Sequence, residues 1–277
     1  MIVGILETYD NKPKPLPMKL PGLTENVIAG VIGQGGLGKS GLIHQIIMEA
    51  SGFKNRLDFK GNQGILKTAY LPAEDPYQAI KHRLYHQLHS SGMTRDEIAV
   101  FAEYHHIDSL FDETPNIMDD HWIEYLHTYA SIYDIIVIDT LRIFHRQNEN
   151  DGSEMTQVVE AMKQIIKETK SSLVFVHHAT KEASKNKDVA DDQFACRGSS
   201  VIVDNSKWIM NLSPVSRVRY ESEFNQLMKY ENENNDYVSF KVTKKNFSKE
   251  DSTYLVKRVG SDIPDISGFH FERINYK

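Results

Sequence analysis

Two periodicities of apolar residues divide the chain into predicted strands and helices. Four short segments rich in apolar residues predict strands, at 27–32, 66–72, 134–139 and 172–178. In three other segments apolar residues recur every three or four positions, which predicts helices at 42–50, 79–88 and 155–167. Acceptor and acidic residues at the starts of two further segments predict helices at 94–103 and 119–130. Strands that alternate with helices are typical of an α/β fold. We therefore expect a central sheet that is mostly parallel.

The last third of the chain has a different pattern, with short apolar segments and little helical repeat. Strands are predicted there at 208–212, 237–242, 253–259 and 269–273. We expect them to add antiparallel strands at the C-terminal edge of the sheet.

The N-terminal segment is rich in proline, with four prolines within residues 10–22. Proline excludes a helix there and favours an extended chain. Residues 1–26 are therefore predicted to form an N-terminal arm, and residues 27–277 one folded domain. Two interpretations of the arm stay open: a flexible leader, or a segment that packs on a neighbouring subunit.

The segment from Gly33 to Ser40 fits the phosphate-loop pattern G-x-x-x-x-G-K-S, between a predicted strand and a predicted helix. Lys39 can reach the β- and γ-phosphates of ATP, and the Ser40 hydroxyl can coordinate Mg²⁺. A glycine-rich turn without function is the alternative, and the flanking strand and helix argue against it. Glycines let the backbone turn tightly and aim its N–H groups at an anion, here at Gly33, Gly35, Gly36 and Gly38.

Two carboxylates follow the second predicted strand, Glu74 and Asp75. In an open α/β sheet the carboxyl ends of the strands face the ligand crevice. Either residue could instead cap the next helix. Asp75, directly before Pro76, fits the cap better. Glu74 is then the candidate that orients and activates a hydrolytic water.

The third and fourth predicted strands also end in residues whose side chains could take part in catalysis or ligand binding. Asp139 ends a buried apolar run, the Walker B pattern, and would join the Mg²⁺ shell beside Ser40. His177 and His178 end the next strand and should face opposite ways. One would pack between sheet and helix, and the other could reach the γ-phosphate.

Composition is that of an ordinary globular protein and sets limits on partners and location. The 277 residues carry a net charge of −6, so any nucleic-acid site must be a local basic patch. The single cysteine, Cys196, excludes an internal disulfide and fits a reducing cytosol. The sequence has no apolar run of membrane-spanning length and no signal peptide. We expect a cytoplasmic protein with no membrane partner.

The chain resembles the RepA-like plasmid replicative helicases, which are hexameric ATPases with a RecA fold. The resemblance runs from about residue 27 to about residue 247. It rests on seven segments: Gly33–Ser40, Tyr70–Pro76, Ala79–Leu84, Pro115–Met118, Val137–Arg142, Phe175–Ala179 and Arg197–Val201.

This resemblance implies a RecA-like phosphate-loop core that assembles head-to-tail into a ring. It implies ATP hydrolysis with Mg²⁺, coupled to movement on single-stranded DNA during plasmid or phage-type replication. It also implies roles for individual residues: Glu74 activates water, Asp139 organises Mg²⁺, His178 senses the γ-phosphate and Arg83 lies near the nucleotide.

One departure from the family pattern concerns the cation that acts across the subunit interface. The family places an arginine in a segment Asp-Asn-x-Arg-Trp, whereas this chain has Lys207 at that position. Lysine carries the charge without the bidentate guanidinium fork. RecA-type ATPases also use lysines of a late strand, and Lys244 and Lys245 lie in such a segment.

In such a ring, the loops after the third and fourth strands face the central channel. The loop at 144–153 carries His145 and Arg146. The longer loop at 179–197 could contact the DNA backbone through three lysines, Lys181, Lys185 and Lys187. The candidates for stacking on bases are Phe144 and Phe194.

Three other functions compete with a ring helicase. A RecA-fold ATPase could act as a loader or as a replication or recombination accessory without unwinding DNA. A small-molecule kinase also uses a phosphate loop, but Glu74 and the two histidines argue against it. A module that binds nucleotide without hydrolysis is disfavoured by the presence of Glu74.

Overall fold

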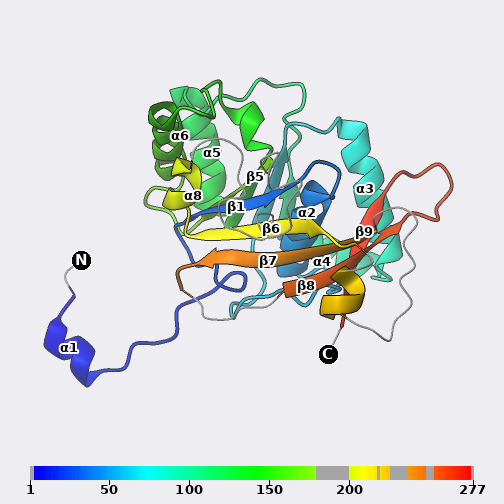
Figure 1. Ribbon diagram of the computed structural model, residues 1–277, viewed down its shortest axis with the longest axis horizontal. Helices are drawn as coiled ribbons and strands as arrows, with labels where there is room; N and C mark the ends of the chain where they lie inside the picture. Colours follow the sequence, from blue (N-terminus) through cyan, green and yellow to red (C-terminus); the bar gives the residue numbers. More distant parts are fainter. Residues whose placement is uncertain (1–2, 179–199, 217–218, 225–235, 248–252, 276–277) are drawn as a thin grey trace.

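The computed structural model describes residues 3–178, 200–216, 219–224, 236–247 and 253–275. Within these ranges the strands form one sheet, in the order β3-β2-β4-β5-β1-β6-β7-β8-β9 (Figure 1). The strands are β1 Ile28–Gly33, β2 Thr68–Pro72, β3 His105–Ile107, β4 Ile135–Asp139, β5 Ser172–His178, β6 Trp208–Pro214, β7 Tyr237–Lys245, β8 Thr253–Gly260 and β9 Phe269–Ile274.

Helices cover both faces of this sheet. The α-helices are α1 Ile5–Asp10, α2 Lys39–Ala50, α3 Tyr77–Ser90, α4 Arg95–Ala102, α5 Asp120–Ile132, α6 Gly152–Ile165 and α8 Val201–Asn205. Two short turns complete the described helical elements, the 3₁₀ turn η1 Leu141–Phe144 and the π turn η2 Tyr220–Phe224.

The central strands are buried on both faces because helices cover each face of the sheet, and successive side chains of a strand point to opposite faces. Val31 and Val137 pack in one core with the apolar face of α2. Ile32 and Ile138 pack in a second core with α5, α6 and α8. Strands buried on both faces read as continuous apolar runs, which is why the sequence revealed them clearly.

The sheet has a parallel part and an antiparallel part, as predicted. β3, β2, β4, β5, β1 and β6 run parallel to one another. β7, β8 and β9 continue the sheet as antiparallel strands. In the parallel part all carboxyl ends meet at one edge, where Gly33 is level with His178 and Pro72 with Asp139.

Besides the short turns η1 and η2, three described elements were not predicted: α1, β3 and α8. Each is short, with six, three and five residues respectively. Elements of this length show no complete period of apolar residues, so the pattern could not reveal them. The apolar run 201–203, in particular, belongs to a helix in which Ile202 and Val203 are buried.

The N-terminal arm separates from the body at a sharply defined point. Residues 3–15 extend away from the sheet and include α1, at the lower left of Figure 1. Leu16 O and Met18 N already form hydrogen bonds with the Asn62 side chain of the body. From Lys19 onward the segment is part of the body, since Leu20 and Leu23 are fully buried. Trp208 Nε1 also donates a hydrogen bond to Pro21 O, at 2.9 Å. The protruding part is therefore shorter than the predicted arm over residues 1–26.

None of the helices in the described ranges combines the length and the apolar character that crossing a membrane requires.

Candidate nucleotide-binding site

The phosphate loop connects β1 to α2 at the edge where the parallel strands end. Gly36 and Gly38 have φ angles of 79° and 82°, which side chains other than glycine rarely adopt. A Cβ atom at Gly35 or Gly36 would meet nothing within 4 Å, so the loop backbone borders open space. An open loop backbone directly before a helix N-terminus suits a bound phosphate.

Lys39 is the first residue of α2, and its side chain lies along this loop. The residue is only 6% exposed, and its Nζ donates a 2.8 Å hydrogen bond to Gln34 O. Burial lowers the pKa of Lys39, while the carboxylates of Asp139 and Glu74 oppose that shift. The same Nζ is 3.4 Å from His178 Nδ1. A lysine can only donate, so Nδ1 of His178 is the acceptor in this contact.

Asp139 ends β4 and is 2% exposed. Burial raises the pKa of Asp139 to about 6, and hydrogen bonds from the Ser40 and Tyr70 hydroxyls counteract this in part. Tyr70 donates to Asp139 Oδ2 at 2.6 Å. Oδ1 has no hydrogen-bond partner among the described residues. A buried carboxylate oxygen left over in this way, beside a serine hydroxyl, fits a Mg²⁺ shell.

Glu74 and Asp75 follow β2 and diverge. Glu74 is exposed, and its charge acts on both Lys39 and Asp139. The expected cap by Asp75 is wrong, because α3 has Pro76 at its N-cap and no side-chain cap. Asp75 instead forms an ion pair with Arg83, at 2.8 Å. A charged partner further along the helix outcompeted the local backbone amides.

A cavity of about 480 Å³ lies beside the phosphate loop. Its lining residues are Gln78, Ala79, His82, Arg83, Ser267, Gly268 and Phe269. Phe269 connects the cavity to the loop, because a Cβ atom at Gly41 would lie 2.5 Å from its ring. The guanidinium groups of Arg83 and Arg258 lie 5.8 Å and 5.6 Å from the centre of that ring.

The family resemblance implies that Arg83 lies near the nucleotide, and Arg83 lines this cavity. The C-terminal wall of the cavity was not predicted. Residues 267–269 follow the phosphate loop by more than 200 positions and match no motif. The one available signal was Gly41, a second glycine directly after the Lys39-Ser40 pair that the phosphate-loop pattern does not require. Glycine there allows the close approach of Phe269.

A comparison with known protein families gives a match over most of the length of the chain. Residues 6–184 match the AAA domain family. This chain belongs to the AAA domain family. The narrower resemblance to RepA-like plasmid helicases stays a prediction.

Solved structures show the same fold as this AAA domain protein. A solved ATPase domain superimposes with a TM-score of 0.58 at 11% identity, covering 96% of this chain and 95% of that one. A DnaB-like replicative helicase, solved with its interactions with primase, gives 0.59 at 12% identity, over 96% of this chain and 66% of that one. The RadB recombinase gives 0.52 at 13% identity, over 84% and 88%. The RecA-like fold predicted from the sequence is thereby confirmed.

The two histidines at the end of β5 lie in different surroundings. His178 is half-buried beside Lys39, at the phosphate loop. His177 is 2% exposed and lies 3.9 Å from Glu149 through its Nε2. The AAA domain chain therefore brings one histidine to the loop and buries the other.

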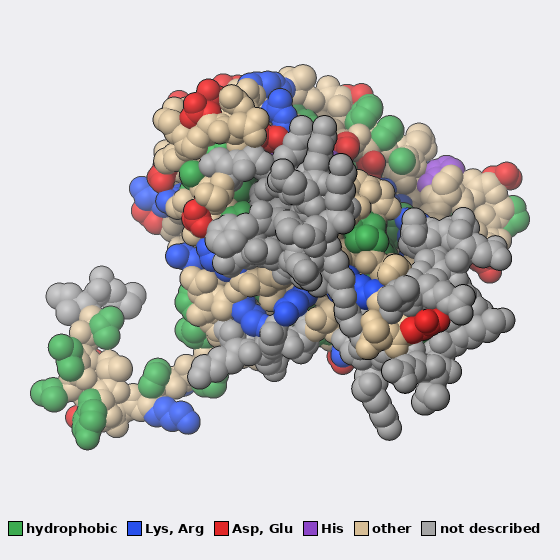
Figure 2. All heavy atoms as spheres, viewed as in Figure 1, with side chains coloured by type: hydrophobic (Ala, Val, Ile, Leu, Met, Phe, Trp, Pro, Cys, Tyr) green, Lys and Arg blue, Asp and Glu red, His purple; other side chains and the backbone are tan. Residues whose placement is uncertain are grey.

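The three candidate interface lysines lie at the opposite edge of the sheet from the phosphate loop of the same chain. Lys207 directly precedes β6, and its N–H donates to Ile28 O at the start of β1. Lys245 pairs with Trp208 in the sheet, so it lies at the same edge. Lys244 Nζ donates to Val203 O and Asp204 O, at 2.7 Å and 3.0 Å. Figure 2 shows basic side chains on the side where β6 begins and β7 ends.

The candidate DNA-binding residues are only partly within the described ranges. Lys181, Lys185, Lys187 and Phe194 lie outside them. Arg146 is exposed, and its Nη1 donates to Ile143 O at 2.8 Å.

Two residues of the 144–153 loop do not suit the role expected of them. Phe144 is fully buried in the core below α6, so it does not offer a stacking surface. His145 is also fully buried, and burial lowers its pKa to about 4. It therefore stays neutral near pH 7 and adds no positive charge to the loop.

Proposed function

We propose that this chain hydrolyses MgATP and uses the reaction to move along single-stranded DNA, as the subunit of a hexameric ring helicase. The observation that carries the proposal is the convergence of four side chains at one edge of the sheet. Lys39, Asp139 and His178 lie around the phosphate loop, and Glu74 is close enough to influence the first two electrostatically.

Each of these residues has a distinct task in hydrolysis. The loop backbone and Lys39 hold the β- and γ-phosphates. Glu74 orients a water molecule and accepts its proton as the water oxygen attacks the γ-phosphorus. The bond from that phosphorus to the bridging oxygen breaks, and ADP leaves. His178, beside Lys39, responds to the presence of the γ-phosphate.

Mg²⁺ fits beside Ser40 and the unpartnered Oδ1 of Asp139, where it would neutralise charge on the phosphate oxygens. The cavity beside the loop accommodates the nucleobase. Its size suits a small-molecule site, and the Phe269 ring offers an aromatic face.

The site is completed by a second copy of the chain. Lys207, Lys244 and Lys245 lie across the sheet from their own phosphate loop, so within one chain they cannot reach it. In a head-to-tail assembly the lysine edge of one copy meets the nucleotide edge of the next. The arm supports such an assembly, because Ile5, Leu6 and Tyr9 are each at least 77% exposed and need an apolar partner.

Mixing two inactive variants tests this shared site. Glu74→Gln is compared with a variant in which Lys207, Lys244 and Lys245 are all replaced by alanine. Each alone should lack ATPase activity. Random mixing should restore roughly a quarter of the seams, because those pair an intact Glu74 with intact lysines. No recovery from two correctly folded variants would contradict a site shared between copies.

ATP hydrolysis measured with and without single-stranded DNA tests the function itself. The wild type should hydrolyse ATP, be stimulated by DNA and displace a strand from a 5′-tailed fork. Lys39→Ala should do none of these. Replacing Lys181, Lys185 and Lys187 with glutamate should remove the stimulation and keep the basal rate. Stimulation without strand displacement would instead indicate a loader or accessory ATPase. No hydrolysis, or phosphate transfer to a metabolite, would contradict the proposal.

A further inference from the structure

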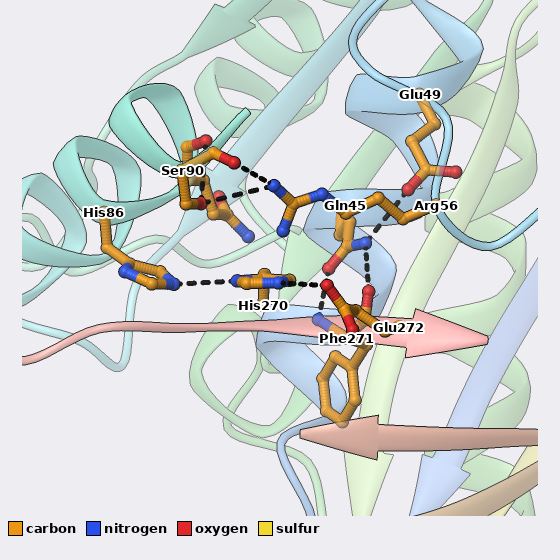
Figure 3. A network of polar contacts seen from close by, with 9 residues as sticks. Gln45, Glu49, Arg56, His86, Ser90, His270, Phe271 and Glu272 are labelled. Atoms are coloured by element: carbon orange, nitrogen blue, oxygen red, sulfur yellow. Dashed lines mark hydrogen bonds and ion pairs between the residues drawn. The ribbon is translucent and has the colours of Figure 1, made fainter. Parts of the chain in front are cut away.

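The last strand of the sheet, β9, is held on its outer side by helices. β8 pairs with one edge of β9, and α2 and α3 pack against β9 as well (Figure 3). Gln45 of α2 meets the backbone of Phe271 with both ends of its side-chain amide. Its Oε1 accepts from Phe271 N at 2.7 Å, and its Nε2 donates to Phe271 O at 2.8 Å.

The Gln45 side chain is fixed in this orientation. Gln45 is 2% exposed, and its Nε2 also donates to Glu49 Oε1 at 2.9 Å. Glu49 Oε2 in turn accepts from Leu57 N at 3.1 Å. The oxygen and one N–H of the Gln45 amide therefore bind the backbone of Phe271. They satisfy the two backbone groups that a further strand would otherwise have paired with.

The contact between Gln45 and Phe271 bears on the position of Phe269, which lines the cavity proposed for the nucleobase. Phe269 and Phe271 project to the same side of β9, and their rings meet edge to face with centres 5.5 Å apart. A Cβ atom at Gly38 would lie 2.9 Å from the Phe271 ring, and one at Gly41 would lie 2.5 Å from the Phe269 ring. Fixing Phe271 thus fixes both rings against the start of α2, which carries Lys39 and Ser40.

A second attachment joins β9 to α3, the helix that carries Arg83. His86 Nε2 and His270 Nδ1 are 2.9 Å apart, and His270 Nε2 is 3.1 Å from Glu272 Oε1. The two imidazole rings are stacked, with centres 5.1 Å apart. Figure 3 shows this relay running from α3 across β9, next to Gln45.

We propose that Gln45 is a positioning residue for nucleobase binding, with the His86–His270 pair as its support on α3. Gln45 contacts β9 and not the nucleotide, and it acts by holding Phe269 and Gly268 in place. This inference rests on the proposed function, because it assigns a determinant of ATP affinity to the same site. The phosphates are held by residues 33–40, so their binding should not depend on Gln45.

The test separates nucleobase affinity from phosphate affinity. Gln45→Met keeps the length and helix propensity of the side chain and removes both bonds to Phe271. We expect KM for ATP to rise about tenfold, because the released β9 would hold the cavity wall in its binding position only about a tenth of the time. The kcat and the inhibition constant of inorganic tripolyphosphate, which lacks a base, should stay within about twofold of wild type.

The chain offers a matched control in Gln87, which is also 2% exposed. Its amide nitrogen and oxygen have no hydrogen-bond partner among the described residues. Gln87→Met should leave KM for ATP unchanged. His86→Phe keeps the ring and removes the bond to His270, and it should raise KM about threefold. It also serves as the test if Gln45→Met does not fold, as judged by circular dichroism.

Three results would overturn the inference. KM for ATP could stay at the wild-type value in folded Gln45→Met. KM and the tripolyphosphate inhibition constant could rise together, which would place the effect on the phosphate loop. Gln87→Met could raise KM as much as Gln45→Met. The wild-type rate in the same series separates the two claims, because absence of wild-type hydrolysis overturns the proposed function as well.

Discussion

Lys19 and Asp139 are buried charges at opposite ends of the same strand, β4. Lys19 is 3% exposed and lies before the amino end of β4, and Asp139 is 2% exposed at the carboxyl end. Burial shifts the pKa of each toward its neutral form, to about 8 for Lys19 and to about 6 for Asp139. By burial alone the two groups look alike.

They differ in how completely their hydrogen bonds are satisfied. Lys19 Nζ donates to Asp134 O at 2.6 Å, to Ser172 Oγ at 3.2 Å and to Lys170 O. These three acceptors use all of its protons. Asp139 accepts from Tyr70 and interacts with Ser40, and its Oδ1 is left without a partner among the described residues. The satisfied Lys19 fits a structural role, whereas the unpartnered oxygen of Asp139, beside the phosphate loop, fits a ligand.

The largest effect that this comparison predicts is that of Asp139→Asn. The exchange keeps an acceptor for Tyr70 and removes the charge that Mg²⁺ would need. ATP hydrolysis should fall by about 10²–10³-fold, as for loss of one group that stabilises a transition-state charge. The free energy of unfolding without nucleotide should rise, by up to about 3 kcal/mol, because the raised pKa of Asp139 marks a charge that the folded state disfavours. ATPase assays and urea denaturation measure the two quantities.

Removing a functional charge should lower activity and raise stability, whereas removing a structural charge should lower stability. If Asp139→Asn lost both activity and stability, Asp139 would be a structural group like Lys19.

Lys19→Met should have the reverse effect. It removes three hydrogen bonds from a buried position, which lowers the free energy of unfolding. Removing a charge that burial disfavours offsets part of this loss, and we expect a net decrease of about 1 kcal/mol. The kcat should stay within about twofold of wild type, because Lys19 lies at the far edge of the sheet. Lys170→Met is the matched control, since the Lys170 side chain is exposed and only its carbonyl contacts Lys19. That control should change stability by less than about 0.5 kcal/mol.

The pH dependence of stability should separate the two groups with a smaller effect. Asp139 has a folded-state pKa above its usual 3.8, so the folded state binds the extra proton and stability falls as pH rises from about 4 to 6. Lys19 has a folded-state pKa below its usual 10.5, so stability rises with pH between about 8 and 10.5.

Denaturation of wild type and variants at a series of pH values measures these slopes. The difference in the free energy of unfolding between wild type and Asp139→Asn should change only between about pH 4 and 6. The difference between wild type and Lys19→Met should change only between about pH 8 and 10.5. A slope in the other window for either variant would show that the shift belongs to a different group.

Sequence patterns revealed the parallel part of the fold and the phosphate-loop side of the site, for a physical reason. β1, β4 and β5 are buried on both faces, so each reads as an apolar run that ends in its functional residue. Gly33–Ser40 and Asp139 are recognisable because their chemistry requires a fixed local spacing.

The other half of the site depends on contacts between residues far apart in the chain. Gln45 and Phe271 are 226 positions apart, and no local pattern connects them. Lys19 and Lys170 are 151 positions apart, and Lys19 lies in a segment that reads as an exposed proline-rich arm. Asp75 reads as a cap because its ion pair with Arg83 depends on side-chain geometry. Such partners become visible only once the chain is folded.

The Mg²⁺ dependence of ATP binding, measured by titration calorimetry, tests the role of Asp139 most directly. Mg²⁺ should tighten ATP binding to the wild type and to Lys19→Met, and should have little effect on ATP binding to Asp139→Asn. If Mg²⁺ strengthened ATP binding equally in all three proteins, the unpartnered oxygen of Asp139 would not be a Mg²⁺ ligand site, and the contrast between the two buried charges would not explain function.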